Sequence, residues 1–202
     1  MKRVYRIGFV LFALIVSFSL VACGNQKLSG ERIAEILGTQ ELPYDYVRAQ
    51  YGIDVEDLRQ VVGAADYVFV CLIKGYDSTI YNDSDFPNTQ YVIEVIANIK
   101  GELRKNDDLI LVKSGGISTK HEKFVLYEYD ILPKISECYI VLAYGQPNGD
   151  ILASGVNSNL LIINKDNYAI DVKYIEITEA FRNEVSSSRQ RFKSRYDIHY
   201  NG

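Results

Sequence analysis

Apolar and polar positions follow a period of two through the middle of the chain, which predicts β-strands. Between Tyr91 and Ile99 the apolar side chains at every second position are separated by Glu94 and Asn98. The continuous apolar runs at 67–73 and 138–144 predict central strands that are covered on both faces. Shorter runs predict further strands at 109–113, 124–129 and 151–154, and a hairpin of 160–163 with 168–172. The polar stretch from Gly75 to Thr89 is expected to be a loop.

Helical spacing of apolar residues appears before and after this region. Ser29 is a credible cap for a helix through Leu37, and Asp54 for a helix that ends at Gly63. Residues 44–51 predict another short helical piece, and Thr178 can cap a final helix that extends to Tyr196. The predicted fold class is therefore mainly β (α+β), a small antiparallel barrel with short N-terminal helices and a C-terminal helix.

The first residues have the pattern of an export signal. Three basic residues precede an apolar run from Ile7 to Ala22, which is shorter than the roughly 20 residues of a membrane-spanning helix. The sequence Leu20-Val21-Ala22-Cys23 follows the order aliphatic, spacer, small, cysteine. It resembles the cleavage site of bacterial lipoprotein signals, and this resemblance implies that Cys23 carries lipid. The alternative is an uncleaved anchor whose cysteine is incidental.

This signal divides the chain and predicts where the protein is found. We expect a lipoprotein signal peptide at 1–22, a tether with short helices at 23–63, a barrel domain at 64–175, and a C-terminal helix and tail at 176–202. The mature protein is expected on the extracytoplasmic face of a bacterial membrane, attached by lipid such as palmitate. Removal of the signal changes the formal charge from −4 to −7, which argues against nucleic acid as a partner.

Two further cysteines, Cys71 and Cys138, lie in apolar runs. They can be two buried thiols or, outside the cytoplasm, a disulfide between neighbouring strands. The sequence leaves both alternatives open. The chain has no Cys-x-x-Cys pair and no cluster of cysteine and histidine, so a structural zinc site is not expected.

The patterns of the common catalytic sites are also missing. His121 and His199 are the two histidines, and neither accompanies a serine nucleophile motif. Asp77, Asp83 and Asp85 could approach Ca²⁺, but Asp85 is followed by Phe-Pro rather than by the residues of an EF-hand loop. We therefore expect a protein that is not an enzyme and that needs no metal or cofactor.

The strand pattern resembles the OB-fold module of netrin-like domains and of the tissue inhibitors of metalloproteinases. The residues that carry the resemblance are 65–70, 91–101 with its Lys-Gly turn, 109–112 with Gly115-Gly116, and 137–142. In those inhibitors the free N-terminal cysteine chelates the zinc of the target. Here Cys23 is expected to be lipidated, and no Cys-x-Cys follows it. The resemblance therefore implies an OB-like barrel and gives little support to protease inhibition.

OB-like barrels usually bind ligands on the face of their second and third strands and in the adjoining loops. The candidate ligand-binding residues near that face are Tyr76, Asp77, Tyr81, Asp83, Asp85, Asn88 and Tyr91. Aromatic rings with polar neighbours suit a sugar or an extended peptide, although tyrosines can also simply cap a barrel end.

The predicted C-terminal helix is basic in its later part, with Arg189, Arg191 and Arg195 among its residues. Such a helix could lie on an anionic membrane, or it could dock on the barrel with its charges in solvent. Together these features predict a lipid-anchored envelope protein whose barrel binds a protein, peptide or glycan. The alternative is a structural or assembly subunit of a membrane complex.

Overall fold

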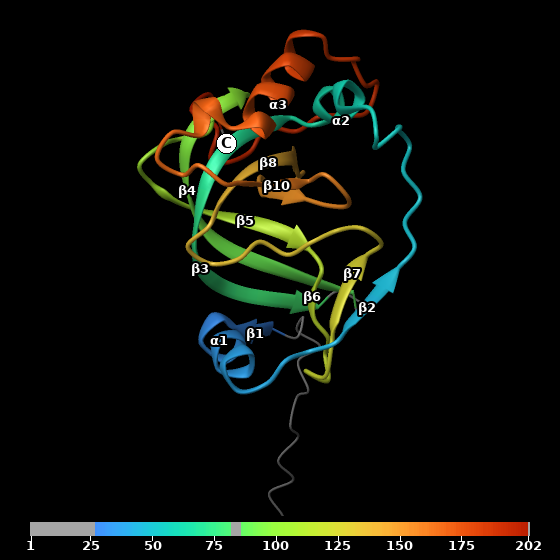
Figure 1. Ribbon diagram of the computed structural model, residues 1–202, viewed down its shortest axis with the longest axis vertical. Coiled ribbons are helices and arrows are strands. Elements are labelled where there is room, and N and C mark those ends of the chain that lie inside the picture. Colours follow the sequence, from blue (N-terminus) through green and yellow to red (C-terminus); the bar gives the residue numbers. More distant parts are fainter. Residues whose placement is uncertain (1–26, 82–85, 202) are drawn as a thin grey trace, which may run out of the picture.

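A bent hairpin of two long strands forms the wall of a five-stranded barrel (Figure 1). The computed structural model describes residues 27–81 and 86–201. The predicted signal segment, Cys23, Asp83 and Asp85 lie outside these residues. Strands β3 (Tyr67–Tyr81) and β4 (Pro87–Lys100) make the hairpin, and β5 (Asp108–Ser114), β8 (Cys138–Gly145) and β9 (Ile151–Ala153) complete the barrel.

The order β3-β4-β5-β9-β8 closes because β8 also pairs with β3. The pairing of β5 with β9 is parallel, and the other pairs are antiparallel. The expectation of a mainly β fold with a small OB-like barrel is confirmed. The predicted loop at 75–89 is wrong, because β3 continues to Tyr81 and β4 begins at Pro87. Thr79 and Thr89 face each other inside this extension, so buried polar side chains occupy positions that the sequence pattern suggests are exposed.

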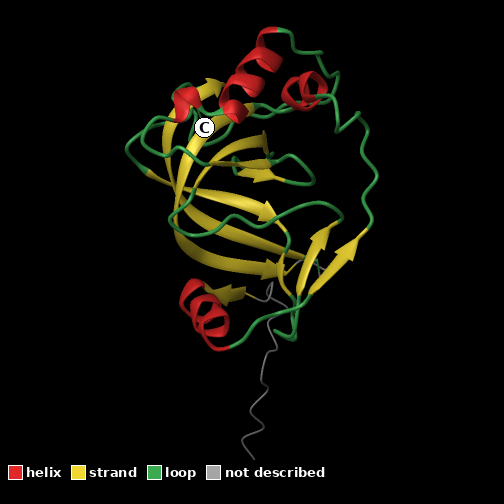
Figure 2. Ribbon diagram, in the orientation of Figure 1, coloured by secondary structure: helices red, strands yellow, loops and turns green. Residues whose placement is uncertain are grey.

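Further strands extend this architecture (Figure 2). Strand β1 (Lys27–Ser29) pairs with β3, and β10 (Asn159–Ile162) pairs with β8. A small second sheet has the order β2-β7-β6, made of β2 (Tyr44–Val47), β7 (Phe124–Tyr127) and β6 (Gly116–Ile117). The prediction of a helix at 44–51 is wrong, since its first half is β2.

The barrel walls separate two apolar cores. Phe69, Ile93 and Leu111 point into the barrel, whereas Val70 and Ile140 point outward beneath the helices. Helices α2 (Leu58–Ala64) and α3 (Val172–Arg182) cover this outer layer at the top of Figure 1. Helix α1 (Gly30–Thr39) packs near the opposite end, against β1 and β3. In the described residues no helix is long and apolar enough to span a membrane.

Local capping explains where the first two helices begin. The Ser29 side chain accepts a hydrogen bond from the Arg32 N–H, as the sequence predicts. Helix α2 is capped by Asp57 rather than by Asp54, because the Asp57 carboxylate accepts from the Arg59 N–H at 3.0 Å. The shorter helix still buries its apolar residues Val61 and Val62.

The C-terminal region differs from its prediction. The segment 168–172 is not a strand: Tyr168–Ile170 forms a 3₁₀ turn and α3 starts at Val172. Helix α3 ends at Arg182, whereas the sequence predicts a helix that continues to Tyr196. Residues 183–201 contain no helix and cross the end of the barrel.

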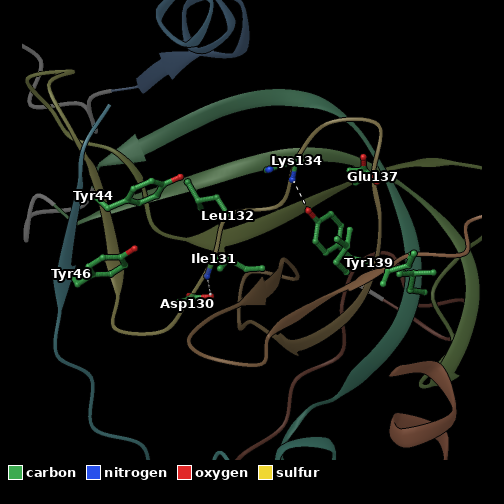
Figure 3. A pocket seen from close by; sticks show the side chains of 11 residues that line it. Tyr44, Tyr46, Asp130, Ile131, Leu132, Lys134, Glu137 and Tyr139 are labelled. Atoms are coloured by element: carbon green, nitrogen blue, oxygen red, sulfur yellow. Dashed lines mark hydrogen bonds between the residues drawn. The ribbon is translucent and has the colours of Figure 1, made fainter. Parts of the chain in front are cut away.

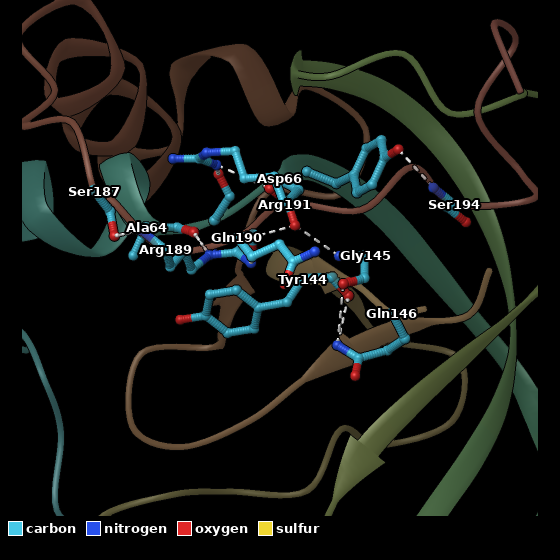
Figure 4. Close-up of polar contacts among 12 residues, drawn as sticks. Ala64, Asp66, Tyr144, Gly145, Gln146, Ser187, Arg189, Gln190, Arg191 and Ser194 are labelled. Carbon is cyan, nitrogen blue, oxygen red and sulfur yellow. Dashed lines mark hydrogen bonds and ion pairs between the residues drawn. The ribbon is translucent and has the colours of Figure 1, made fainter. Parts of the chain in front are cut away.

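Two arginines of this C-terminal segment bind the residue just before β3 (Figure 4). The guanidinium groups of Arg189 and Arg191 both pair with the Asp66 carboxylate, and Asp66 also accepts the Gly145 N–H at 2.8 Å. Arg189 donates to Ala64 O, and Arg191 donates to Gly63 O and Ala65 O, which lie at or next to the C-terminal end of α2. These charges therefore dock on the protein, and they do so from an extended segment rather than from a helix.

Cys71 and Cys138 are free, buried thiols. Cys71 pairs in register with Tyr139 and points into the barrel, whereas Cys138 is opposite Leu72 and points to the outer core. The disulfide alternative is therefore wrong, because side chains at successive positions of a strand project from opposite faces.

Candidate functional site

A groove opens between the small sheet and the barrel, and it is the candidate binding site (Figure 3). Its volume is about 530 Å³, and most of its lining is apolar. Three parts of the chain line it: Tyr44 and Tyr46 of β2, the loop residues Asp130, Ile131, Leu132, Lys134 and Glu137, and Tyr139 with Leu161, Ile162 and Ile163 at β8 and β10. Ile131, Leu161 and Ile163 are all exposed, Ile163 to 86%. Apolar side chains gathered in one exposed concave surface are typical of a binding site.

Strand β2 supplies one wall, and within residues 27–81 and 86–201 its outer edge pairs with no other strand. It is the outer strand of the small sheet, and all four of its residues are exposed. Phe124 donates its N–H to Pro43 O, and Glu128 donates its N–H to Val47 O. Since alternate residues of a parallel strand bond to the same neighbour, the backbone groups of Tyr44 and Tyr46 point away from β7.

The rings of Tyr44 and Tyr46 form a flat aromatic surface beside the groove. They lie parallel within 9°, with centroids 6.0 Å apart, and Tyr44 also stacks on Phe124. Figure 3 shows both rings projecting from β2 toward Leu132 and Ile131. Tyr46, Tyr44 and Phe124 therefore form a continuous stack of rings along this wall.

A buried ion pair supports the groove floor. Lys113 projects from β5 and pairs with Asp130, and both side chains are almost fully buried. Lys113 also donates to Ser158 Oγ at 3.1 Å, and Asp130 Oδ1 accepts the Ile131 N–H at 2.8 Å. Burial lowers the pKa of Lys113 and raises the pKa of Asp130, because removal from water disfavours each charged form. The pair fixes the loop backbone just where Ile131 enters the groove.

A smaller cavity of about 90 Å³ adjoins the groove on the side of the barrel. Tyr44, Leu132 and Lys134 line both spaces, so they stand at the junction between them. Tyr91 lines the inner cavity and is fully buried, and its hydroxyl has no hydrogen-bond partner among the described residues. Burial raises the pKa of Tyr91 well above its usual value, so this hydroxyl remains a neutral donor.

The predicted ligand-binding residues do not form one site. Tyr76 and Tyr91 do come together, with ring centroids 5.3 Å apart, and both line the inner cavity. Tyr81 is buried under α1, and its hydroxyl donates to Ser118 O. The prediction that Tyr81 and Tyr91 border an open face is wrong, because both rings are buried.

The polar members of that predicted set are engaged elsewhere or lie outside the described residues. Asp77 is 3.5 Å from Lys27 Nζ and accepts a hydrogen bond from Ser78. Asn88 accepts from the Ser114 hydroxyl at 3.4 Å and lies beside a different surface hollow. Asp83 and Asp85 are not among the described residues. Within 27–81 and 86–201 no group of three acidic, histidine or cysteine side chains is placed to hold a metal.

Most groove residues were missed by sequence reasoning. Tyr44, Lys134 and Leu161 come from three separate segments, and only folding brings them together. One signal was available, because the exposed alternation Tyr44-Asp45-Tyr46-Val47 fits an edge strand better than a helix.

No protein-family model matches this chain, and no curated protein sequence matches it.

Proposed function

We propose that this chain is a lipid-anchored envelope protein, without catalytic activity, whose groove binds an extended peptide segment of a partner protein. The observation that carries the proposal is the apolar groove beside the free edge of β2. A strand added to this edge would use the backbone groups of Tyr44 and Tyr46. Its alternate side chains would point the same way as the two tyrosine rings, into the groove.

The groove lining supports a peptide more than a glycan. Sugars stack on aromatic rings and need many polar groups around them, and Tyr44 and Tyr46 alone would suit such a ligand. The opposite wall, however, is formed by Ile131, Leu161 and Ile163. Aliphatic side chains of a bound peptide would gain about 25 cal/mol for each Å² that they remove from water there.

The first experiment tests peptide binding on the full chain, extracted from its membrane in mild detergent. A library of random dodecapeptides is selected for binding, and amide hydrogen exchange is measured with and without the selected peptides. We expect the peptides to slow exchange at Tyr44 and Tyr46, since added strand hydrogen bonds protect these amides. Leu161→Arg places a charge in the groove and should abolish binding. The matched control Ile175→Arg alters another exposed apolar residue, in α3, and should leave binding unchanged.

Two results would contradict the proposal: peptides that protect α3 rather than β2, or protection of β2 by oligosaccharides and by no peptide. Attachment is tested separately. Cys23→Ala should move the protein from the membrane fraction to the soluble fraction, and retention in the membrane would overturn the lipid anchor.

A second candidate function, an assembly subunit of a membrane complex, is supported by an exposed apolar surface near the start of α3. Ile170, Val172 and Ile175 are exposed to 60%, 65% and 56%. If a partner subunit binds this surface, Ile175→Arg should abolish its crosslinking to the protein in the envelope, and Leu161→Arg should not. The same two variants thus distinguish the two functions.

A further inference from the structure

The groove and its inner cavity offer hydrogen-bond donors for which the described residues supply no acceptor. Tyr91 is fully buried, lines the inner cavity, and has no partner for its hydroxyl among the described residues. A buried polar group that stays unpaired costs about 1–3 kcal/mol, so such groups in folded proteins usually serve a ligand or water. The hydroxyl is therefore placed to donate to a group that enters the cavity.

A positive charge stands at the entrance to this cavity. Lys134 lines both the groove and the inner cavity, and its ammonium group makes no ion pair within residues 27–81 and 86–201. Its backbone is fixed, because the Lys134 N–H donates to the Tyr139 hydroxyl at 3.0 Å. Figure 3 shows this bond between the loop and β8. The lysine side chain is thus carried by an anchored part of the loop.

The carboxylates near the groove already have partners. Asp130 is neutralised by Lys113, and Glu137 pairs with Lys165 at 2.9 Å. Within the described part of the chain, the groups around the inner cavity that lack a partner thus include a cation, Lys134, and a buried hydroxyl donor, Tyr91, and the complementary ligand group is an anion with acceptor oxygens. The cavity volume of about 90 Å³ fits a carboxylate. A phenyl ring needs a cavity of roughly 150 Å³, so an aromatic side chain would not enter.

We propose that the inner cavity receives the C-terminal carboxylate of the bound peptide, with Lys134 supplying the charge and Tyr91 a hydrogen bond. This inference rests on the proposed peptide-binding function. It also fixes the direction of the peptide. Tyr44 lines the inner cavity and Tyr46 does not, so the peptide ends beside Tyr44 and runs antiparallel to β2.

The test compares two forms of one ligand on the full chain in mild detergent. Acetylated hexapeptides built from alanine, valine, leucine, tyrosine and serine are prepared as free acids and as C-terminal amides. Their only possible carboxylate is the terminal one. We expect the acids to bind about tenfold more tightly than the amides, as one charge-assisted hydrogen bond supplies. A spin label at the peptide N-terminus should broaden the amide signal of Val47 more than that of Tyr44.

Two variants separate the charge from the hydroxyl. Lys134→Met should weaken the acids about tenfold and leave the amides unchanged, whereas the control Lys105→Met alters an exposed lysine of another loop and should change neither. Tyr91→Phe should weaken the acids about tenfold, while its melting temperature stays at or above that of the wild type, because the removed hydroxyl has no partner. The control Tyr81→Phe should not affect binding.

The outcomes distinguish the carboxylate site from the peptide-binding function. Equal binding of acids and amides, both protecting β2 from hydrogen exchange, overturns the carboxylate site and leaves the peptide-binding function in place. Failure of both forms to bind overturns the two proposals together. Acid-selective binding that survives both Lys134→Met and Tyr91→Phe also overturns the assignment of the inner cavity.

Discussion

The buried pair of Lys113 and Asp130 allows a quantitative test of how the groove floor is held. Both side chains are almost completely removed from water, and each is the counter-ion of the other. Replacing Lys113 with methionine keeps much of its volume but leaves the Asp130 carboxylate buried without a counter-ion. We therefore expect Lys113→Met to be strongly destabilising, even though methionine retains most of the apolar contacts of the lysine side chain.

The magnitude follows from the burial of both partners. Breaking a buried pair by removing one member costs about 3–5 kcal/mol. For a domain of this size, each kcal/mol changes the melting temperature by roughly 2–4 °C, so Lys113→Met should lower it by roughly 6–20 °C. The double variant Lys113→Met/Asp130→Leu removes both charges and should recover most of that loss. Burial shifts the pKa of both groups toward the neutral form, which indicates that the ionised pair is itself costly.

The assay is urea unfolding, followed by circular dichroism, of the wild type, the single variants Lys113→Met and Asp130→Leu, and the double variant. The coupling energy between the two positions should be about 3 kcal/mol or more. Lys123→Met is the matched control, since Lys123 pairs with Asp45 at the surface, with side chains 38% and 49% exposed. It should cost less than about 1 kcal/mol. If Lys113→Met costs no more than Lys123→Met, the buried pair does not support the groove as described.

Three further predictions concern other parts of the fold. Asp66→Ala leaves two guanidinium groups without their shared carboxylate, so trypsin should cleave the C-terminal segment much faster, whereas Glu179→Ala, which removes the carboxylate of the exposed pair with Arg182, should not change the rate. The pKa of Asp57 is lowered from 3.8 to about 2 by its hydrogen bond and charge contact with Arg59, so its contribution to stability is present above pH 3.8 and is lost as the pH falls through 2. Thermal unfolding between pH 5 and pH 2 should show this loss, and Asp57→Asn should remove it. Burial raises the pKa of Cys71 and of Cys138, so both thiols should resist iodoacetamide in the folded protein and react after unfolding; a disulfide on a non-reducing gel would contradict the structure.

Sequence patterns predict this fold best for strands and helix caps that depend on residues close to one another in the chain. The alternation from Tyr91 to Ile99 and the run at 138–144 both became barrel strands, and Ser29 caps α1. Prediction failed where distant segments supply the partners. Residues 44–47 have exposed side chains and no buried helical face. They form a strand because their backbone pairs in parallel with β7.

The candidate site was predicted less well than the fold. Tyr91 was identified as important, but its ring lies beneath the surface, because the inward positions of β4 are filled with large side chains. Lys134 gives no periodic signal, since it lies in a loop whose course depends on the Tyr139 hydroxyl and on Lys165, which donates to Ser136 O. Which donors lack an acceptor is a property of the three-dimensional arrangement alone.

The contacts of Asp66 also determine the order in which this protein can finish folding. Asp66 immediately precedes the first barrel strand, β3, yet the arginines that neutralise it lie near the end of the chain. A ribosome that has synthesised every barrel strand has not yet made Arg189, so the carboxylate at the start of β3 still lacks its counter-ions. The barrel can form before that moment, but the Asp66 carboxylate at one end of it then lacks its two counter-ions. The C-terminal segment therefore completes the surroundings of the first barrel strand, and a truncation that removes Arg189 and Arg191 would leave Asp66 without counter-ions more than a hundred residues away in the sequence.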